Sequence, residues 1–97
     1  KDMRERKGKI EELSDGFIAL PGGIGTLEEL LEIWVGRYLG FHQKPIAILD
    51  PAGDYSSLRV ALDDLTAKSF MKPGQHEQVL WCSTIPDALE HMRASVA

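Results

Sequence analysis

Hydrophobic residues gather in three short runs along the chain, and none of the runs alternates clearly with polar residues. The runs span residues 17–20, 46–49 and 79–82, and Gln78 precedes the last of them in the predicted strand 78–82. Short runs of this kind are typical of strands that are buried on both faces of a parallel sheet. The pattern therefore predicts three buried strands at these positions.

The segments before and after the first run have helical spacing. Residues 1–13 are mostly charged, with Ile10 and Leu13 among the few apolar positions, and they predict a helix whose outer face is solvated. A second helix is expected from Leu27 to near Leu39, with Gly40 as its C-terminal stop. Within this helix, Trp34 is expected to be a core residue.

Two further helices are predicted in the second half of the chain. A turn cluster at residues 50–54 precedes the first of them, which Asp54, Ser56 or Ser57 could cap. A loop at residues 72–74 precedes the third strand, and Pro86 is well placed in the first turn of the last helix. The expected apolar faces consist of Leu58, Ala61, Leu62 and Leu65 in the first of these helices and of Ala88, Leu89 and Met92 in the last.

Strand and helix therefore alternate along the chain. Such alternation predicts an α/β fold in which right-handed crossovers place helices on both faces of a parallel sheet. In sheets of this kind, ligands bind beyond the carboxyl ends of the strands. The segment after the first strand, residues 21–26, falls at such a position.

Length and composition exclude several classes of function. The chain has 97 residues, enough for one small domain, and its 43% hydrophobic and 27% charged residues are ordinary for a globular protein. A net charge of -4 gives no basic surface for nucleic acid or an anionic membrane. No apolar run approaches membrane-spanning length and no signal peptide is recognised, so a cytoplasmic location is expected.

Cysteine and histidine residues contribute little to the expected chemistry. Cys82, the only cysteine, lies in an apolar run and is expected to be a buried, inert thiol. His42 is expected to serve the turn before Lys44, whereas His76 and His91 are expected at the surface. No spacing of histidine, cysteine and carboxylate residues predicts a metal site.

The nine residues from Pro21 to Glu29 carry the candidate chemistry. They join the first strand to the second helix, so bare backbone N–H groups at a helix N-terminus can meet a phosphate or another anion. Gly22, Gly23 and Gly25 would let the turn adopt positive φ and let a ligand approach the main chain closely. The spacing differs from both familiar phosphate loops, G-x-x-x-x-G-K-[ST] and G-x-G-x-x-G.

A purely structural interpretation of the same residues stays open. Thr26-Leu27-Glu28-Glu29 fits the capping-box pattern, in which Thr26 caps the helix and Glu29 reaches back to the N–H of the cap. The turn would then be only a tight connection between strand and helix. From the residues alone, the glycine-rich turn is interpreted as an anion site of unspecified purpose, and the default interpretation of Glu29 is a capping residue.

Four sequence elements, taken in order, resemble a known family. Residues 21–29 match the signature P-G-G-x-G-T-x-x-E of the LOG family, the cytokinin riboside 5′-monophosphate phosphoribohydrolases. Residues 3–7 resemble its M-x-x-R-K, residues 14–20 its S-D-A-F-I-A-L and residues 39–45 its L-G-x-H-x-K-P. Members of this family are often labelled lysine decarboxylases, but nothing in the sequence suggests a pyridoxal-phosphate site.

The resemblance implies a Rossmann-like three-layer fold with a parallel sheet. Residues 1–97 would form a single, partial domain with three predicted strands, the C-terminal part of a LOG-like nucleotide-binding domain. The implied activity is hydrolysis of the N-glycosidic bond of purine nucleoside 5′-monophosphates, N6-substituted ones included, to the free base and ribose 5-phosphate. The implied assembly is a homodimer with its site near the subunit interface, and no cofactor, nucleic acid or membrane partner is expected.

The resemblance also assigns roles to individual residues. Glu29 takes the place of the carboxylate that stabilises positive charge developing on the ribose, and Arg6 shares its site. Because arginine is always charged, an electrostatic role suits Arg6 better than general acid catalysis. Phosphate or nucleotide contacts are expected from Arg6, Lys7, Pro21, Gly22, Gly23, Ile24, Gly25 and Thr26.

Two other functions stay open beside the enzyme. Many family members have T-W-x-Q-L-G where this chain has Val-Gly-Arg-Tyr-Leu-Gly at residues 35–40, which leaves base preference and dimer geometry undetermined. Molybdenum-cofactor carrier proteins share a similar turn and fold but bind their ligand without hydrolysing it. A structural half-domain without activity is the third interpretation. The presence of both Arg6 and Glu29 favours the enzyme.

Overall fold

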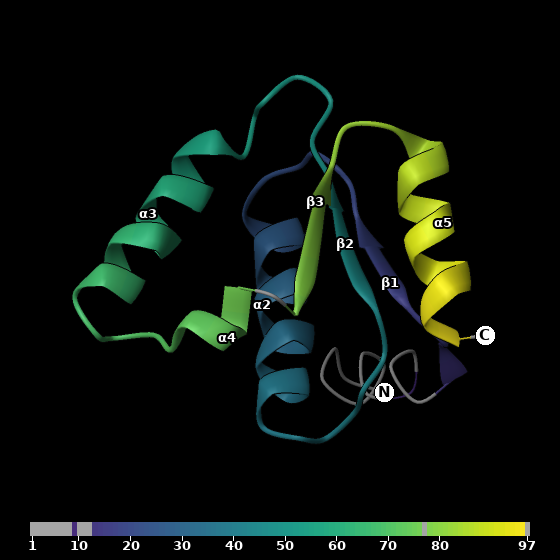
Figure 1. The fold of residues 1–97 in the computed structure, drawn as a ribbon. Helices are drawn as coiled ribbons and strands as arrows, with labels where there is room; N and C mark the ends of the chain where they lie inside the picture. Colours follow the sequence, from purple (N-terminus) through teal and green to yellow (C-terminus); the bar gives the residue numbers. More distant parts are fainter. Residues whose placement is uncertain (1–8, 10–12, 77, 97) are drawn as a thin grey trace.

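The computed structural model describes residues 9, 13–76 and 78–96. Its elements follow in the order β1 (Phe17–Ala19), α2 (Ile24–Tyr38), β2 (Ile46–Leu49), α3 (Ser56–Ala67), α4 (Pro73–His76), β3 (Val79–Cys82) and α5 (Ile85–Val96) (Figure 1). The strands form one parallel sheet in the order β1-β2-β3. The predicted strands and their alternation with helices are confirmed, but only β2 is buried throughout, whereas β1 and the two middle residues of β3 are half-buried. The helix predicted over residues 1–13 falls mostly outside the described residues.

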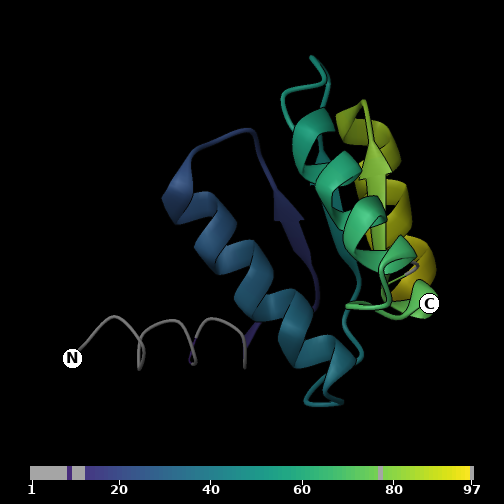
Figure 2. The ribbon, with the colours of Figure 1, turned by 90° about the vertical axis from the view of Figure 1, so that its left-hand side faces the viewer.

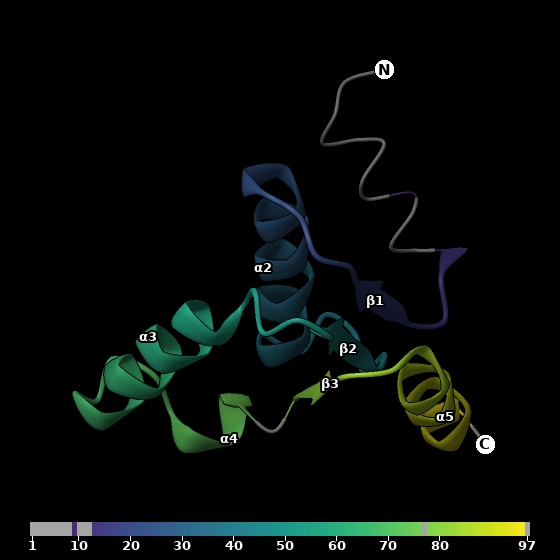
Figure 3. The same cartoon turned by 90° about the horizontal axis from the view of Figure 1, so that it is seen from above.

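Helices cover both faces of the sheet, so the domain has three layers. α2, α3 and α4 lie on one side of the strands and α5 lies on the other (Figure 3). Because successive side chains of a strand point to opposite faces, Ile46 and Ile48 pack toward α2, whereas Ala47 and Leu49 pack toward α5. All four are buried. The predicted α/β class is confirmed, and the chain forms a partial Rossmann-like domain.

The C-terminal end of α2 is closed by a glycine, as predicted. Gly40 follows the helix with a φ of 89°, a conformation that favours glycine. Its N–H donates to the Arg37 carbonyl at 3.0 Å, and the N–H of Phe41 donates to the Gly36 carbonyl at 2.8 Å. This pair of hydrogen bonds is a Schellman motif, which satisfies two of the last helical carbonyls.

The predicted N-cap of α3 is wrong. The cap position is occupied by Tyr55, and no side chain caps the helix there, so Asp54, Ser56 and Ser57 do not have the expected role. The Ser56 hydroxyl donates instead to the Gly53 carbonyl at 2.9 Å. The turn before the helix uses this hydroxyl, and it is therefore unavailable as a cap.

The predicted apolar face of α3 is buried only in part. Leu62 is buried and Leu58 is half-buried, whereas Ala61 and Leu65 are exposed. The reason is the position of the helix. α3 lies at the edge of its layer, beyond α2 and α4, where one side of the helix meets the core (Figure 3).

The start of α5 agrees with its prediction, and its apolar face agrees in part. Thr84 Oγ1 accepts the N–H of Asp87 at 3.2 Å, and Pro86 lies in the first turn. Ala88 is buried and Met92 is half-buried, but Leu89 is 56% exposed because it lies on a different side of the helix. The loop predicted at residues 72–74 is wrong for residues 73 and 74, which belong to the short helix α4.

Two side chains expected inside the protein are buried. Trp34 is 4% exposed, and its indole N–H donates to the Gln75 carbonyl at 3.0 Å. Cys82 is a buried free cysteine, and burial, with a further contribution from the Asp87 carboxylate, raises the pKa of its thiol. A raised pKa keeps a thiol protonated and unreactive, in agreement with the expected inert thiol.

The sequence-based prediction is confirmed for His42 but not for His91. His42 supports the turn before Lys44, as predicted: Nε2 donates to the Ile33 carbonyl at 2.9 Å, and Nδ1 accepts the Lys44 N–H at 3.0 Å. His91 is half-buried, so its predicted surface position is wrong. It lies three residues after Ala88 and shares the sheet-facing side of α5. The side chain of His76 lies outside the described part of the chain.

The described residues contain neither a membrane-spanning helix nor a cluster of metal-binding side chains. Within residues 9, 13–76 and 78–96, no helix has the length and apolar character needed to cross a membrane. In the same part of the chain, no group of three or more histidine, cysteine, aspartate or glutamate side chains is placed to hold a metal ion.

Candidate functional site

The candidate site lies where β1 runs into α2. Figure 2 shows this turn at the same end of the molecule as the connection from β2 to α3. α2 begins at Ile24 with Gly23 as its N-cap, and the Leu27 N–H donates to the Gly23 carbonyl at 3.1 Å. The turn therefore lies beyond the carboxyl end of a parallel strand, as predicted.

The capping-box interpretation of Thr26 and Glu29 is wrong. Because the helix begins at Ile24, Thr26 is already its third residue and cannot occupy the cap position. Gly23 takes that position with its backbone alone, and no side chain caps this end of α2. The helix thus starts three residues before the predicted Leu27, and Glu29 has no capping role.

The glycines of the turn matter through their small size. Gly22, Gly23 and Gly25 all have φ outside the positive range, so the turn does not use the positive φ that these glycines would allow. A Cβ on Gly22 would lie 2.3 Å from the Thr26 hydroxyl oxygen, so any larger residue there would displace the Thr26 side chain. A Cβ on Gly23 or Gly25 would meet nothing within 4 Å. At those two positions, the described packing does not require glycine, and the main chain is left uncovered.

The uncovered main chain presents backbone donors to the outside. The N–H groups of Ile24, Gly25 and Thr26 precede the Leu27 N–H and have no acceptor within the helix. Ile24 is 87% exposed. The first turn of α2 carries no acidic residue, so no carboxylate there competes for the positive end of the helix dipole. This arrangement suits a phosphate or another anion.

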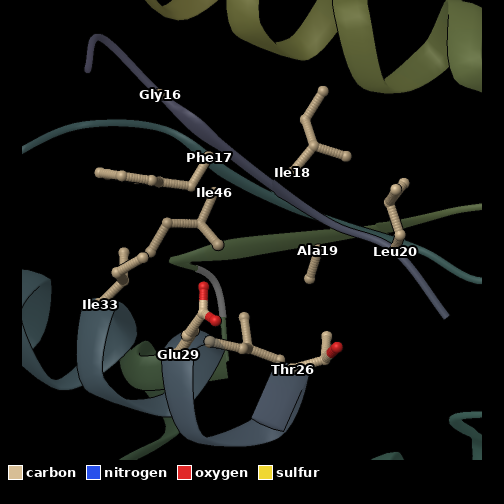
Figure 4. Close-up of a pocket in the computed structure, with 10 residues that line it drawn as sticks. Gly16, Phe17, Ile18, Ala19, Leu20, Thr26, Glu29, Ile33 and Ile46 are labelled. Carbon is tan, nitrogen blue, oxygen red and sulfur yellow. The ribbon is translucent and has the colours of Figure 1, made fainter. Parts of the chain in front are cut away.

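Glu29 lies one turn further along α2, on the face that carries Thr26. Both residues line a hollow of about 390 Å³ between α2 and β1, and Figure 4 shows the Glu29 carboxylate pointing from the helix toward the strand. The side chain is exposed, and no other residue that the structure describes forms a hydrogen bond or ion pair with it. The remaining lining residues are Gly16, Phe17, Ile18, Ala19, Leu20, Leu30, Ile33 and Ile46. The carboxylate is thus available to a ligand.

A tyrosine that the sequence did not single out also reaches the turn. The buried Tyr55 donates its hydroxyl to the Leu20 carbonyl at 2.6 Å, immediately before Pro21. The available signal in the sequence was its place after the turn cluster at residues 50–54, which follows the second predicted strand.

The structure brings most of the predicted site residues together. Pro21, Gly22, Gly23, Ile24, Gly25, Thr26 and Glu29 all lie in the turn or in the first two turns of α2. Arg6 and Lys7 lie outside the described residues, so their places in the site stay predictions.

Fold and site define the class of this protein as a partial Rossmann-like α/β domain with an open, glycine-rich turn at the carboxyl end of its sheet. The family model described as possible lysine decarboxylase matches residues 1–92. The chain is 44% identical over 87 residues to the cytokinin riboside 5′-monophosphate phosphoribohydrolase of Mycobacterium tuberculosis. It is 40% identical over 91 residues to the Arabidopsis thaliana protein of that name, LOG3. The chain therefore belongs to the LOG family.

The matches cover nearly all of this chain but only part of each relative. They span 90% and 94% of the chain but 46% and 42% of the Mycobacterium tuberculosis and Arabidopsis thaliana proteins. A probable cytokinin riboside 5′-monophosphate phosphoribohydrolase of Oryza sativa subsp. japonica is 41% identical over 93 residues, which is 96% of the chain and 37% of the relative. The chain thus spans less than half the length of these curated relatives.

Proposed function

We propose that a protein containing this segment, at the length of its relatives, hydrolyses the N-glycosidic bond of purine nucleoside 5′-monophosphates, N6-substituted ones included. The products are the free base and ribose 5-phosphate. Residues 1–97 would form the C-terminal part of its nucleotide-binding domain. The observation that carries the proposal is the Glu29 carboxylate, which stands one turn from an open helix start in a chain of the LOG family.

In this proposal, the 5′-phosphate binds at the start of α2. The N–H groups of Ile24, Gly25 and Thr26, together with the Thr26 hydroxyl, donate to its oxygens at the positive end of the helix dipole. The bare backbone at Gly25 lets the phosphate approach closely. Further phosphate or nucleotide contacts are proposed for Arg6, Lys7, Pro21, Gly22 and Gly23.

Glu29 then faces the anomeric carbon of the ribose. It lies five residues beyond Ile24, roughly 8 Å along the axis at the rise of an α-helix. The 5′-phosphate is joined to the ring at C4′ through C5′, and C1′ follows C4′ across the ring oxygen, so a phosphate held at the helix start would leave C1′ within reach of the carboxylate. Its negative charge would stabilise an oxocarbenium-like transition state.

The proposed step consumes one water molecule. Glu29 accepts a proton from this water while the water oxygen forms the new bond to C1′. At the same time the bond from C1′ to the base nitrogen breaks, and the base takes up a proton from solvent. Arg6 is proposed to neutralise phosphate or to assist the departing base through its charge.

Chromatography of adenosine monophosphate and an N6-substituted relative, incubated with the full-length protein, tests the proposal. Base and ribose 5-phosphate should appear in equal amounts. Tight binding of an unchanged nucleotide would contradict hydrolysis and support a nucleotide or molybdenum-cofactor carrier. The absence of both binding and turnover would support a structural half-domain instead.

We also propose that the full-length protein is a homodimer with its site near the subunit interface. α2 exposes apolar side chains in addition to those that it buries: Leu31 is 40% exposed, Val35 44% and Tyr38 47%. A helix that is apolar on more than one side is usually buried on more than one side. Alternatively, the exposed apolar side of α2 is covered by the part of the full-length protein that this chain does not span.

Sedimentation of the full-length protein shows whether a second copy or the rest of the same chain covers α2. Leu31→Glu should give a monomer if a second copy covers α2, because burying a charge without a partner is costly. Val60→Glu, at an exposed position of α3, is the matched control and should leave the dimer intact. A monomeric wild type with normal turnover would contradict the proposed dimer.

A further inference from the structure

The connection from β2 to α3 carries a buried tyrosine whose hydroxyl reaches the candidate site. Tyr55 is 5% exposed and belongs to the core cluster on the α2 face of the sheet. Its hydroxyl donates to the Leu20 carbonyl at 2.6 Å, although the two residues are 35 positions apart in the sequence. The contact joins the connections that leave the carboxyl ends of the neighbouring strands β1 and β2.

Tyr55 is itself held in place by its own connection. Its N–H donates to Asp50 Oδ1 at 3.1 Å, and the Asp50 N–H donates to the Cys82 carbonyl at 2.8 Å. Gly53, with a φ of 75°, allows the turn between Asp50 and Tyr55. The position of the hydroxyl is therefore set by the ends of β2 and β3.

The acceptor of this hydrogen bond is the last carbonyl before the glycine-rich turn. The pairing of β1 with β2 ends at Ala19, so Leu20 lies beyond the strand ladder. The ring of Pro21 restricts the next φ, and the direction of the Leu20 carbonyl therefore sets the direction in which the turn leaves the strand. An O–H···O distance of 2.6 Å lies at the short end of the ordinary range.

We infer that Tyr55 is a positioning residue for the phosphate site. Its hydroxyl holds the turn so that the backbone donors of Ile24, Gly25 and Thr26 converge on the 5′-phosphate, and the inference rests on the proposed function. A phenylalanine would fill the same space in the core, so packing alone does not require the hydroxyl. The group that requires it is the Leu20 carbonyl.

Tyr55→Phe in the full-length protein tests the inference, because it removes the hydroxyl and keeps the ring. We expect the KM for adenosine monophosphate and the inhibition constant of inorganic phosphate to rise about tenfold, the effect of one well-placed hydrogen bond. The kcat and the inhibition constant of adenosine, which lacks the phosphate, should stay unchanged. Thr66→Val is the matched control: it removes a half-buried hydroxyl that donates to the Leu62 carbonyl at 2.9 Å within α3, and its variant should behave as the wild type.

The outcomes separate the inference from the function on which it rests. A Tyr55→Phe protein that retains the wild-type KM and phosphate inhibition overturns the positioning role. If the wild type still hydrolyses the nucleotide, the proposed function is unaffected by that result. An equal loss for phosphate and adenosine also overturns it, because a general structural defect would weaken both. A wild type that neither hydrolyses the nucleotide nor binds phosphate overturns the proposed function itself.

Discussion

The two ends of α2 are built in opposite ways. At the C-terminal end, Gly40 closes the helix through a Schellman motif, and Arg37 donates to the carbonyls of Lys44 at 3.1 Å and Gln78 at 3.0 Å. At the N-terminal end, no side chain caps the helix. There, Glu29 has no hydrogen-bond or ion-pair partner among the residues that the structure describes.

This difference separates the part of the helix that serves the fold from the part that is free to serve a ligand. The bonded end ties α2 to the segments that enter β2 and β3. Glycine occurs at both ends for different reasons: Gly40 supplies a positive φ, whereas Gly25 has a helical backbone with room for a Cβ. In the proposed function, the bare backbone at Gly25 admits the phosphate.

The largest effect is expected from Glu29→Gln at the open end. Glutamine keeps the shape but lacks the charge that the transition state needs, so the rate of base release should fall by about 10²–10⁴-fold. The melting temperature should change little, because the side chain is exposed. Glu32→Gln, on the same helix, is the matched control for the rate measurement and should remain active. Near-normal turnover by Glu29→Gln would remove this residue from the mechanism.

The next largest effect is expected from Arg37→Met at the bonded end. Loss of two hydrogen bonds from a charged, half-buried side chain should lower the free energy of unfolding by about 2 kcal/mol. Arg59→Met is the matched control: its guanidinium stacks over the Trp81 ring at 5.1 Å, and its loss should cost less than about 1 kcal/mol. Denaturant titration measures both variants. Equal losses would contradict the special role of Arg37.

Gly40→Ala and Gly25→Ala should change stability in opposite directions. Alanine at position 40 must adopt a positive φ, which should lower the free energy of unfolding by about 1 kcal/mol. Alanine at position 25 favours the helix and should raise it by about 0.5 kcal/mol, while it weakens inhibition by inorganic phosphate. Denaturant titration and inhibition assays of both variants check this. Destabilisation by Gly25→Ala would show that this glycine serves the fold after all.

The smallest effect concerns α3, which ends in the same motif as α2 but with serine in place of glycine. Ser69 has a φ of 69°, its N–H donates to the Thr66 carbonyl at 3.0 Å, and the Phe70 N–H donates to the Leu65 carbonyl at 2.9 Å. Ser69→Gly should raise the free energy of unfolding by about 0.5–1 kcal/mol, because relief of strain exceeds the entropy cost of glycine.

A serine within α3 is the control for this change. Ser57→Gly, at an exposed position in the first turn of the helix, should lower the free energy of unfolding, since glycine is the poorer helix former. Denaturant titration measures both variants. Destabilisation by both would show that no strain is stored at Ser69.

Local pattern was enough to predict much of this protein. The three apolar runs became strands, and the central run is buried throughout because helices cover both faces of the sheet there, whereas β1 and the middle of β3 are half-buried at the edges of the sheet. Gly40 was recognisable as a helix stop because its left-handed backbone is a property of one residue and its neighbours. The glycine-rich turn was recognisable as a candidate anion site because it links a strand to a helix.

Tertiary structure alone decided which groups meet at that turn. Thr26 and Glu29 fit a capping box in sequence, yet the helix begins at Ile24, so both residues lie within it and neither occupies the cap position. The Tyr55 hydroxyl reaches the Leu20 carbonyl only because β1 and β2 are adjacent in the sheet. Periodicity along a chain reports which residues are buried, whereas the partner of a buried polar group depends on strand order and helix packing between distant residues.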